Sequence, residues 1–504
     1  MKAVLTLGDL FEALTGTKPS SAVGTAEASV PYSVAALGEQ RITRVAIDSR
    51  QVVPGAVFFA LQGEALDGHQ FIGEALARGA IAIVGNARAR ELEFGRTLTL
   101  IDVAGLQPNS SFAALSPESV PLVITANSLS ALQKFAGHWR KKFPNVQVIG
   151  VTGSVGKTST KELIWAVLKQ RYRTLKSQGN LNSETGLPLT IFNLNETHER
   201  AVLEMGMYAR GEIAALCEIA EPTIGVVTLV APIHLERLGT IENIANAKAE
   251  LVAALPEHGW AILNGDDVRV RAMRDKTRAS VVTFGLDATN DVWADEIASH
   301  GLDGMSFALH HQGTHLHVRV PLLGQHSVHT ALAAAAVGIA EKLSWEEILR
   351  GLQDVSAQLR LIAVPGKNGI TILDDTYNAS PPSTLSALNL LSEMSERKIA
   401  VLGDMRELGA YEREGHQLVG IRAAEVADVI IAVGALGKFI GDAARGQGHA
   451  EVHYAQDNAQ AIEHITRVAR AGDIVLVKGS RGAQMENIVQ ALALDTEAHG
   501  GHGH

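Results

Sequence analysis

The sequence has little cysteine and no long apolar run. Its one cysteine, Cys217, excludes an intramolecular disulfide and is typical of a reducing compartment, where we expect it to be a buried apolar side chain. The longest apolar run, residues 331–340, is about half the length of a membrane span. Asp9 and Glu12 interrupt the apolar pattern of the N-terminus, which favours a short amphipathic helix over a signal peptide. We therefore expect a cytoplasmic protein with no membrane span.

Basic side chains are also in the minority. The chain has 44 lysines and arginines against 54 acidic residues, a net charge of −10. This balance argues against nucleic acid or an anionic membrane as the main partner, but allows a local basic pocket for an anionic small molecule. With 46% apolar and 19% charged residues, the chain is globular, and 504 residues are too many for one ordinary core.

Strand and helix patterns alternate along two long stretches of the chain, beginning near Val146 and Ile370. This alternation predicts the α/β class, with βαβ units and mostly parallel sheets. We expect a central P-loop-type sheet flanked by helices, a small α/β N-terminal domain and a Rossmann-like α/β C-terminal domain. The predicted segments are residues 1–104, a linker at 105–121 rich in Pro, Ser, Asn and Ala, the central domain 122–323, the C-terminal domain 324–494 and a flexible tail 495–504.

The most informative stretch is VQVIGVTGSVGKTSTKEL, residues 146–163, a β-branched strand followed by a glycine-rich turn and a helix. Glycines let backbone N–H groups approach phosphate oxygens, Lys157 can reach the outer phosphates, and the Thr158 hydroxyl can ligate Mg²⁺. The spacing is narrower than in the Walker A motif, because Val151 stands where that motif has its first glycine. The residues expected around the nucleotide phosphates are Thr152, Gly153, Ser154, Val155, Gly156, Lys157, Thr158 and Ser159.

Three charged or titratable residues follow within the same alternating stretch. Glu204 ends an apolar strand, where a carboxylate needs a partner such as Mg²⁺ or a salt bridge. His234 follows the next strand, so we expect it at the same carboxyl edge, in a metal or phosphate role rather than in the core. Lys248 lies on a predicted helix, and its spacing alone indicates a solvated surface lysine.

Two polar loops offer hydrogen-bonding groups to a ligand. GNLNSETG, residues 179–186, contains Asn180 and Asn182, which suit ligand recognition or self-satisfied turn chemistry equally well. In AILNGDD, Asn264 and Asp266 follow a strand and suit recognition of a base edge and of ribose hydroxyls. Each loop alone is a weak signal.

Taken in order, TGSVGKT, GNLNSE, LEMGM with GEI, and HLERLGT resemble the central domain of the Mur ligase family. These are ATP-dependent, amide-forming enzymes of peptidoglycan precursor synthesis. DDTYNASP (374–381), VLGDMRELG (401–409) and LVKGSRGAQME (476–486) resemble the member that adds D-alanyl-D-alanine to UDP-N-acetylmuramoyl-tripeptide. The N-terminal run beginning IDSRQVVPG is similar to that member and to the ligase that adds the third residue.

The resemblance implies a reaction through an acyl phosphate on the peptide carboxylate, which the incoming amine then attacks. It implies ATP, two Mg²⁺ ions held by Thr158, Glu204 and His234, and catalytic roles for Lys157, His234 and Lys248. In the family, the lysine that Lys248 matches is often carbamylated, which reverses the surface interpretation. It also implies a monomer whose partners are UDP-N-acetylmuramoyl-tripeptide and D-alanyl-D-alanine.

Binding residues are carried over from the same motifs. Asn264 and Asp266 match adenosine-binding positions, and Arg360 matches an arginine that approaches the ATP phosphates. The residues expected to bind the UDP-peptide or the amine are Ser49, Arg50, Gly63, Asp67, Gly68, His69, Asn180, Asn182, Asp374, Asp375, Tyr377 and Asn378.

The chain departs from the family pattern at six polar positions, which are Leu229, Ser183, Gln325, Ser327, Thr330 and Ser380. These changes put individual nucleotide contacts in question and leave the phosphate loop and the C-terminal motifs intact. Two alternative functions are the ligase that adds the third residue and a nucleotide-dependent switch without ligase chemistry. The sequence leaves open whether the third peptide residue is diaminopimelate or lysine.

Overall fold

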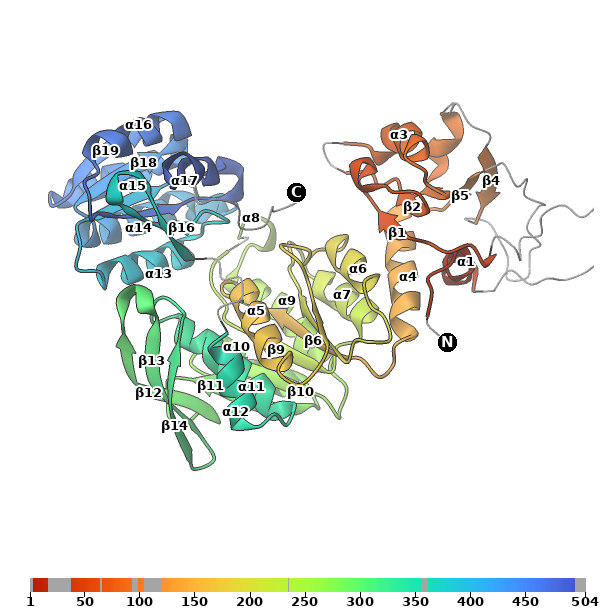
Figure 1. Ribbon diagram of the computed structural model, residues 1–504, viewed down its shortest axis with the longest axis horizontal. Helices are drawn as coiled ribbons and strands as arrows, with labels where there is room; N and C mark the ends of the chain where they lie inside the picture. Colours follow the sequence, from red (N-terminus) through yellow and green to blue (C-terminus); the bar gives the residue numbers. More distant parts are fainter. Residues whose placement is uncertain are drawn as a thin grey trace, which may run out of the picture. The chain divides into compact units, whose positions relative to one another are not determined.

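The computed structural model describes residues 3–16, 38–63, 66–92, 98–103, 120–233, 235–354 and 361–494. His234, Arg360 and the tail 495–504 therefore lie outside the described residues, as does the predicted linker except for its last two positions. The chain divides into two compact units, Met1–Ile149 with Tyr172–Met205 and Ala214–Pro222, and Gly150–Arg171 with Gly206–Ile213 and Thr223–His504. Three sheets, dominated by parallel strands and flanked by helices, confirm the predicted α/β class (Figure 1).

The first unit contains a five-stranded parallel sheet with helices on both faces. Its strands β2 (Ala56–Phe59) and β3 (Ala82–Gly85) are buried over their whole length, as expected of a parallel sheet covered on both sides. Helices α1 (Leu7–Thr15) and α4 (Ser128–Lys141) supply one core, and α3 (Ile72–Ala77) supplies the other. The sheet order is β1 (Arg44–Ala46), β2 (Ala56–Phe59), β3 (Ala82–Gly85), β5 (Val120–Ile124) and β4 (Leu98–Asp102).

A second group of strands in this unit positions the predicted carboxylate Glu204. The order is β6 (Gln147–Thr152), β8 (Arg200–Glu204) and β7 (Thr174–Lys176), and β7 runs parallel to β8. β6 begins in the first unit and its last three residues belong to the second. Helix α6 (Gly186–Ile191) follows the GNLNSETG loop directly.

In the second unit, β6 is followed by β9 (Ile224–Val227), β10 (Trp260–Asn264), β11 (Ser280–Gly285), β12 (Val292–Ser299), β13 (Met305–His311) and β14 (Thr314–Val320). β9 to β12 are parallel, whereas β12, β13 and β14 form an antiparallel meander. The phosphate loop, Thr228, Asn264 and Leu286 all follow carboxyl ends of parallel strands. Since such ends meet at one edge, the sequence order brings these residues together.

Two helices of this region pack against α5 (Lys157–Leu168), the helix that begins in the phosphate loop at Lys157. The alanine-rich α11 (Ser327–Ala340) and α12 (Trp345–Leu352) both contact α5. A Cβ on Gly351 would lie 2.4 Å from the Cα of Val167, so the small residue allows close helix packing. Both helices lie beyond the predicted boundary at residue 323, and α11 also contacts β10 to β13. The second unit also contains α8 (Leu235–Leu238), α9 (Ile241–Ala253) and α10 (Val268–Arg271), whereas α7 (Glu212–Ala220) belongs to the first unit from Ala214 on.

The last sheet is doubly wound, as the Rossmann-like prediction requires. Its order is β15 (Ile362–Pro365), β16 (Thr371–Asp375), β20 (Ile474–Lys478), β17 (Lys398–Leu402), β18 (Val429–Val433) and β19 (Glu451–Ala455), with β15 alone antiparallel. One core is built by α13 (Pro381–Ser392), α14 (Glu412–Val426) and α15 (Gly434–Gln447), the other by α16 (Asn458–Val468) and α17 (Glu486–Leu492).

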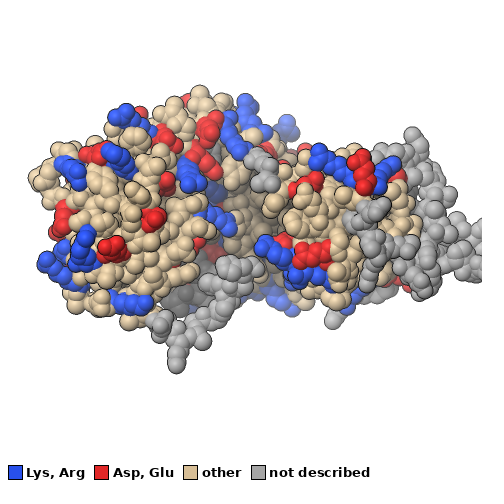
Figure 2. Space-filling model, turned by 90° about the horizontal axis from the view of Figure 1, so that it is seen from above, with Lys and Arg blue, Asp and Glu red and all other residues tan. Residues whose placement is uncertain are grey.

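Two surface properties bear on the sequence expectations. Among the described residues, no helix is both long enough and apolar enough to span a bilayer. On the face drawn in Figure 2, basic and acidic side chains are interspersed.

Candidate active site

The phosphate loop joins β6 to α5 through two glycines with positive φ. Gly153 has φ +148° and Gly156, the residue before the helix, has φ +85°. A Cβ on Gly153 would lie 1.8 Å from Oγ1 of Thr228, so only glycine fits without a shift. The N-terminus of α5, which begins at Lys157, offers N–H groups and the positive end of the helix dipole to an anion.

Residues that follow β9 hold the phosphate loop in place by hydrogen bonds. The Thr228 hydroxyl donates to the carbonyl of Val155 at 2.6 Å, and the Ser154 N–H donates to the carbonyl of Leu229 at 2.7 Å. The buried Ser154 hydroxyl donates to the Ala231 carbonyl at 3.1 Å and accepts from the Ala231 N–H at 2.9 Å. Both hydrogen bonds of the Ser154 hydroxyl are thus made to the protein backbone. Thr228 supports the loop as well, and the sequence did not predict this role.

Two lysines approach the loop. Lys157 Nζ donates to the Gly153 carbonyl at 2.8 Å. Lys248 on α9 is 2% exposed, so its interpretation as a solvated surface lysine is wrong. Burial lowers the pKa of Lys248 well below its ordinary value, and the positive charge of Lys157 lowers it further. The amine of Lys248 is therefore neutral far more readily than an exposed lysine.

A pocket of about 700 Å³ opens beside the loop. Asn264, at the end of β10, is 6% exposed, and its Oδ1 accepts from the Asp266 N–H at 3.0 Å. No described residue accepts from its Nδ2, which leaves both N–H donors of the amide for a ligand. The residues that line the pocket include Val155, Gly156, Thr160, Thr228, Leu229, Asn264, Gln325, His329, Thr330, Ser386 and Asn389.

Asp266 organises one wall of this pocket. Its Oδ2 accepts from His329 Nε2 at 2.8 Å and from the Leu286 N–H at 2.7 Å, while Oδ1 accepts from the Asp287 N–H and Asn290 Nδ2. Burial alone would raise the pKa of this carboxyl, but the hydrogen bonds outweigh burial and hold the pKa well below its usual range. The ionised Asp266 therefore fixes the ring of His329, which lines the pocket.

Three of the six departures from the family pattern line this same pocket, namely Leu229, Gln325 and Thr330. The Oγ of Ser327 is buried and has no hydrogen-bond partner among the described residues. The other two departures are used locally. Ser183 Oγ accepts from the Gly186 N–H at 3.2 Å, and Ser380 precedes α13 in a capping box.

The predicted metal ligand Glu204 is fully buried at the end of β8. Its Oε1 accepts from Asn182 Nδ2 at 2.8 Å, and its N–H donates to Ser177 Oγ at 3.1 Å. A buried carboxylate needs charged or hydrogen-bonding partners, and hard oxygen donors such as this one are those that Mg²⁺ prefers. Glu204, and the Thr158 hydroxyl at the start of α5, each supply an oxygen suitable for the ion. Asn180 is an exposed residue of the preceding loop.

The N-terminal residues predicted to hold the UDP group follow β1 and β2. Ser49 Oγ donates to Glu74 Oε2 at 2.7 Å, and Arg50 pairs with Asp48 at 2.7 Å while its side chain is 80% exposed. The Arg50 guanidinium is thus largely exposed while it pairs with Asp48.

His69 has a supporting place in the same region. Its ring accepts from the Asn86 N–H through Nε2 and donates to Asp67 through Nδ1 at 2.6 Å. Burial would raise the pKa of Asp67, but hydrogen bonds from His69 and Arg88 outweigh burial and lower it. A Cβ on Gly68 would lie 2.6 Å from the Leu61 carbonyl oxygen, so the turn requires glycine. Gly63 closes the same turn by donating its N–H to Leu66.

In the DDTYNASP loop, a buried ion pair joins β16 to β20. Lys478 Nζ donates to Asp375 Oδ2 at 2.6 Å and to the Asn378 carbonyl at 2.9 Å. Burial raises the pKa of neighbouring Asp374, although its carboxylate accepts from Thr376. The Arg481 guanidinium lies 5.8 Å from the Tyr377 ring centre. Lys478 was not predicted, but a charge ending the apolar strand IVLVK is the same signal that identified Glu204.

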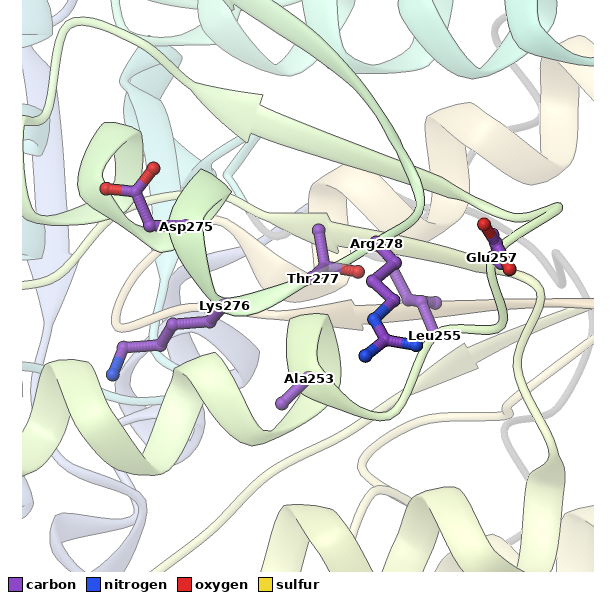
Figure 3. A pocket seen from close by; sticks show the side chains of 7 residues that line it. All are labelled: Ala253, Leu255, Glu257, Asp275, Lys276, Thr277 and Arg278. Atoms are coloured by element: carbon purple, nitrogen blue, oxygen red, sulfur yellow. The ribbon is translucent and has the colours of Figure 1, made fainter.

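A second pocket, drawn in Figure 3, lies away from these residues. Its volume is about 430 Å³, and none of the predicted site residues lines it. Figure 3 shows the side chains of Lys276 and Arg278 extending from the segment that follows α10, with Ala253 at the end of α9. Glu257 and Asp275 balance the two cations, so the pocket carries no net charge.

Comparison with known families accounts for the motifs. Family models described as "Mur ligase family, catalytic domain", "Mur ligase middle domain" and "Mur ligase, glutamate ligase domain" match residues 41–140, 151–338 and 359–481. The chain belongs to the Mur ligase family, which confirms the resemblance seen in its motifs.

Several of its relatives carry the name of one member of that family. The chain is 33% identical to the UDP-N-acetylmuramoyl-tripeptide–D-alanyl-D-alanine ligase of Bacillus subtilis, over 89% of this chain and 92% of the relative. It is 34% identical to the ligase of the same name from Escherichia coli, with 89% and 93% covered. A crystal structure of MurF from Acinetobacter baumannii superposes with a TM-score of 0.79 at 28% identity, covering 97% of this chain and 99% of that one. MurF from Thermotoga maritima in complex with ADP has a TM-score of 0.73 at 28% identity, with 89% and 96% covered.

Proposed function

We propose that this chain uses ATP to join D-alanyl-D-alanine to the peptide carboxylate of UDP-N-acetylmuramoyl-tripeptide in the cytoplasm. The observation that carries the proposal is that the phosphate loop forms part of the wall of the 700 Å³ pocket. Val155 and Gly156 belong to the loop and also line the pocket. Asn264 lines the same pocket and offers its amide there. A nucleoside triphosphate fits such a site, with its phosphates at the N-terminus of α5.

The reaction has two balanced steps. The peptide carboxylate attacks the γ-phosphorus of ATP, forming an acyl phosphate and releasing ADP. The dipeptide amine then attacks the acyl carbon, loses a proton, and inorganic phosphate leaves with the electrons of the acyl C–O bond. Both steps depend on positioning and on neutralising phosphate charge, which the loop N–H groups and Lys157 supply.

Mg²⁺ fits the donor set that Thr158 and Glu204 provide, and when bound it would neutralise phosphate charge. His234 is the third ligand of this proposal. Asn182 holds the Glu204 carboxylate by its 2.8 Å hydrogen bond, so it orients a ligand rather than reacting itself.

We further propose that Lys248 is carbamylated. Its pKa is lowered by burial and by Lys157, so the neutral amine needed for addition to CO₂ is available. The Nζ lone pair forms the N–C bond and one proton is released, giving an anionic oxygen donor. The carbamate is an anion, so it attracts the positive charge of Lys157, which a protonated Lys248 would repel. A ¹³C NMR carbamate signal that appears with labelled bicarbonate and is absent in Lys248→Arg checks the modification.

The three family-matched segments have separate roles in this proposal. The N-terminal segment holds the UDP group with Ser49, Arg50 and the turn around His69, and the middle segment holds ATP. The DDTYNASP loop and Arg360 of the last segment serve the amine and the ATP phosphates.

The decisive experiment measures phosphate release from ATP with purified protein, UDP-muramoyl-tripeptide and D-alanyl-D-alanine. We expect release only when both substrates are present, and a pentapeptide product by mass spectrometry. Release that needs neither substrate would exclude ligase chemistry and favour a nucleotide-dependent switch. Turnover with UDP-muramoyl-dipeptide and a free diamino acid, in place of these substrates, would assign the chain to the ligase for the third residue.

A further inference from the structure

Three histidines form a continuous strip on one face of the hairpin β13–β14. His315 and His317 are two residues apart on β14 and so point to the same face, while His310 on β13 lies directly opposite His315. The ring centres of His310 and His315 are 4.6 Å apart, and those of His315 and His317 are 5.0 Å apart. We call these three residues the histidine strip.

The strip faces solvent rather than the core. His315 and His317 are exposed, whereas Val318 and Phe307 are buried and point to the other side of the sheet. None of the three histidines lines the nucleotide pocket or belongs to the predicted site residues. Packing therefore does not account for the imidazoles of His315 and His317, whereas the side chain of His310 is only 18% exposed.

Neighbouring groups orient the ring of His310, and a carboxylate also lies near His317. His310 stacks on Trp293 with ring centres 3.8 Å apart, and its Nε2 bonds Asp295 Oδ1 at 2.8 Å, which leaves Nδ1. His317 Nδ1 lies 3.7 Å from Glu296 Oε2, which leaves Nε2. A carboxylate on the second ring nitrogen is the usual partner of a metal-binding imidazole, because it fixes ring orientation and raises ligand basicity.

From this arrangement we propose that His310, His315 and His317 bind a divalent transition-metal ion, with Zn²⁺ as the probe. Imidazole nitrogens are the ligands that Zn²⁺ takes at about 2.0–2.1 Å, and three histidines leave a fourth position for water. Two such nitrogens on one tetrahedral ion are about 3.3 Å apart. Among the described residues only Asp9, Glu12 and His138 have ligand atoms that all lie within 4.8 Å of one another. Metal binding by the strip therefore requires the exposed rings of His315 and His317 to turn toward His310.

A competing cluster of Asp9, Glu12 and His138 in the first unit is less suited to a metal. Lys142 Nζ already bonds Asp9 there, so a cation occupies the centre of that group. Among the described residues, no lysine or arginine forms a hydrogen bond or an ion pair with the histidine strip.

The test uses isothermal titration of the full chain with ZnCl₂ at pH 7.5. The C-terminal HGGHGH would itself bind metal, so the reference protein carries His499→Ala, His502→Ala and His504→Ala. We expect one Zn²⁺ per reference chain, loss of that binding in His315→Asn, and roughly 10–100-fold weaker binding in Asp295→Ala. Replacing Zn²⁺ by Co²⁺ gives visible d–d absorption that disappears with the same variant.

The matched control is His464→Asn, which removes one ring of another histidine pair, His453 and His464, with centres 5.1 Å apart. We expect unchanged binding in this control. Thermal unfolding of His315→Asn should match that of the reference protein, because His315 is exposed. No stoichiometric Zn²⁺ uptake by the reference protein, or equal uptake by His315→Asn, overturns the proposal.

Discussion

The buried pair of Asp375 and Lys478 gives the sharpest test of how the last sheet is built. Asp375 on β16 and Lys478 on β20 are direct cross-strand partners. The side chain of Lys478 is 2% exposed and that of Asp375 is 12% exposed. Lys478→Met leaves the Asp375 carboxylate buried without its cation. Removing one partner of a buried pair lowers the free energy of unfolding by about 3–5 kcal/mol. The equilibrium constant for unfolding of this sheet then rises by about two to four powers of ten. The double variant Asp375→Asn, Lys478→Met should cost less than the sum of the single changes.

Hydrogen–deuterium exchange with mass spectrometry is the appropriate assay. All five tryptophans lie between Trp139 and Trp345, so fluorescence would not report on the last sheet. Exchange protection of β16 and β20 should fall in Lys478→Met, while that of β2 and β3 stays unchanged. The matched control Lys438→Met removes the exposed pair with Asp442 and should cost at most about 1 kcal/mol. Equal protection in both lysine variants would refute the reasoning.

Three further predictions concern the nucleotide site. Lys157→Ala should abolish ATP-dependent phosphate release and leave UDP-peptide binding intact, as calorimetry can check; near-normal rates would contradict the loop assignment. Gly153→Ala should abolish ATP binding, because its Cβ meets Thr228, and retained affinity would show that the loop can shift. His329→Ala should raise the KM for ATP several-fold with little change in kcat. Because the pKa of Asp266 is lowered in the folded protein, its stabilisation is present above its unfolded pKa and is lost as pH falls. The stability difference between wild type and His329→Ala should therefore shrink below about pH 4, and a pH-independent difference would contradict this role.

The α/β class and the phosphate loop were predictable because both depend on local patterns. Alternating apolar strands and helices are visible over a few residues each, and the loop from Thr152 to Ser159 is continuous in sequence. Glu204 was predictable too, because a charge at the end of an apolar strand stands out. The same reasoning applied to IVLVK would have identified Lys478.

Other features depended on which elements pack together. Lys248 has the spacing of a surface lysine, yet α9 packs so that its amine is buried near Lys157. Asp266 suited ribose recognition, but the loop after β11 and His329 on α11 occupy both of its oxygens. These partners lie 20 to 63 residues away along the chain, so no local pattern indicates them.

The sequence by itself determined that strands and helices alternate, that a nucleotide phosphate loop precedes α5, and that the motifs are those of Mur ligases. Only the tertiary structure decided which charges are buried, which hydroxyls support the loop, and which departures from the family pattern meet at one pocket. Motifs are read along the chain, whereas burial and pairing depend on distances in space, which strand order sets. Asp375 and Lys478, 103 residues apart, touch because β20 lies beside β16.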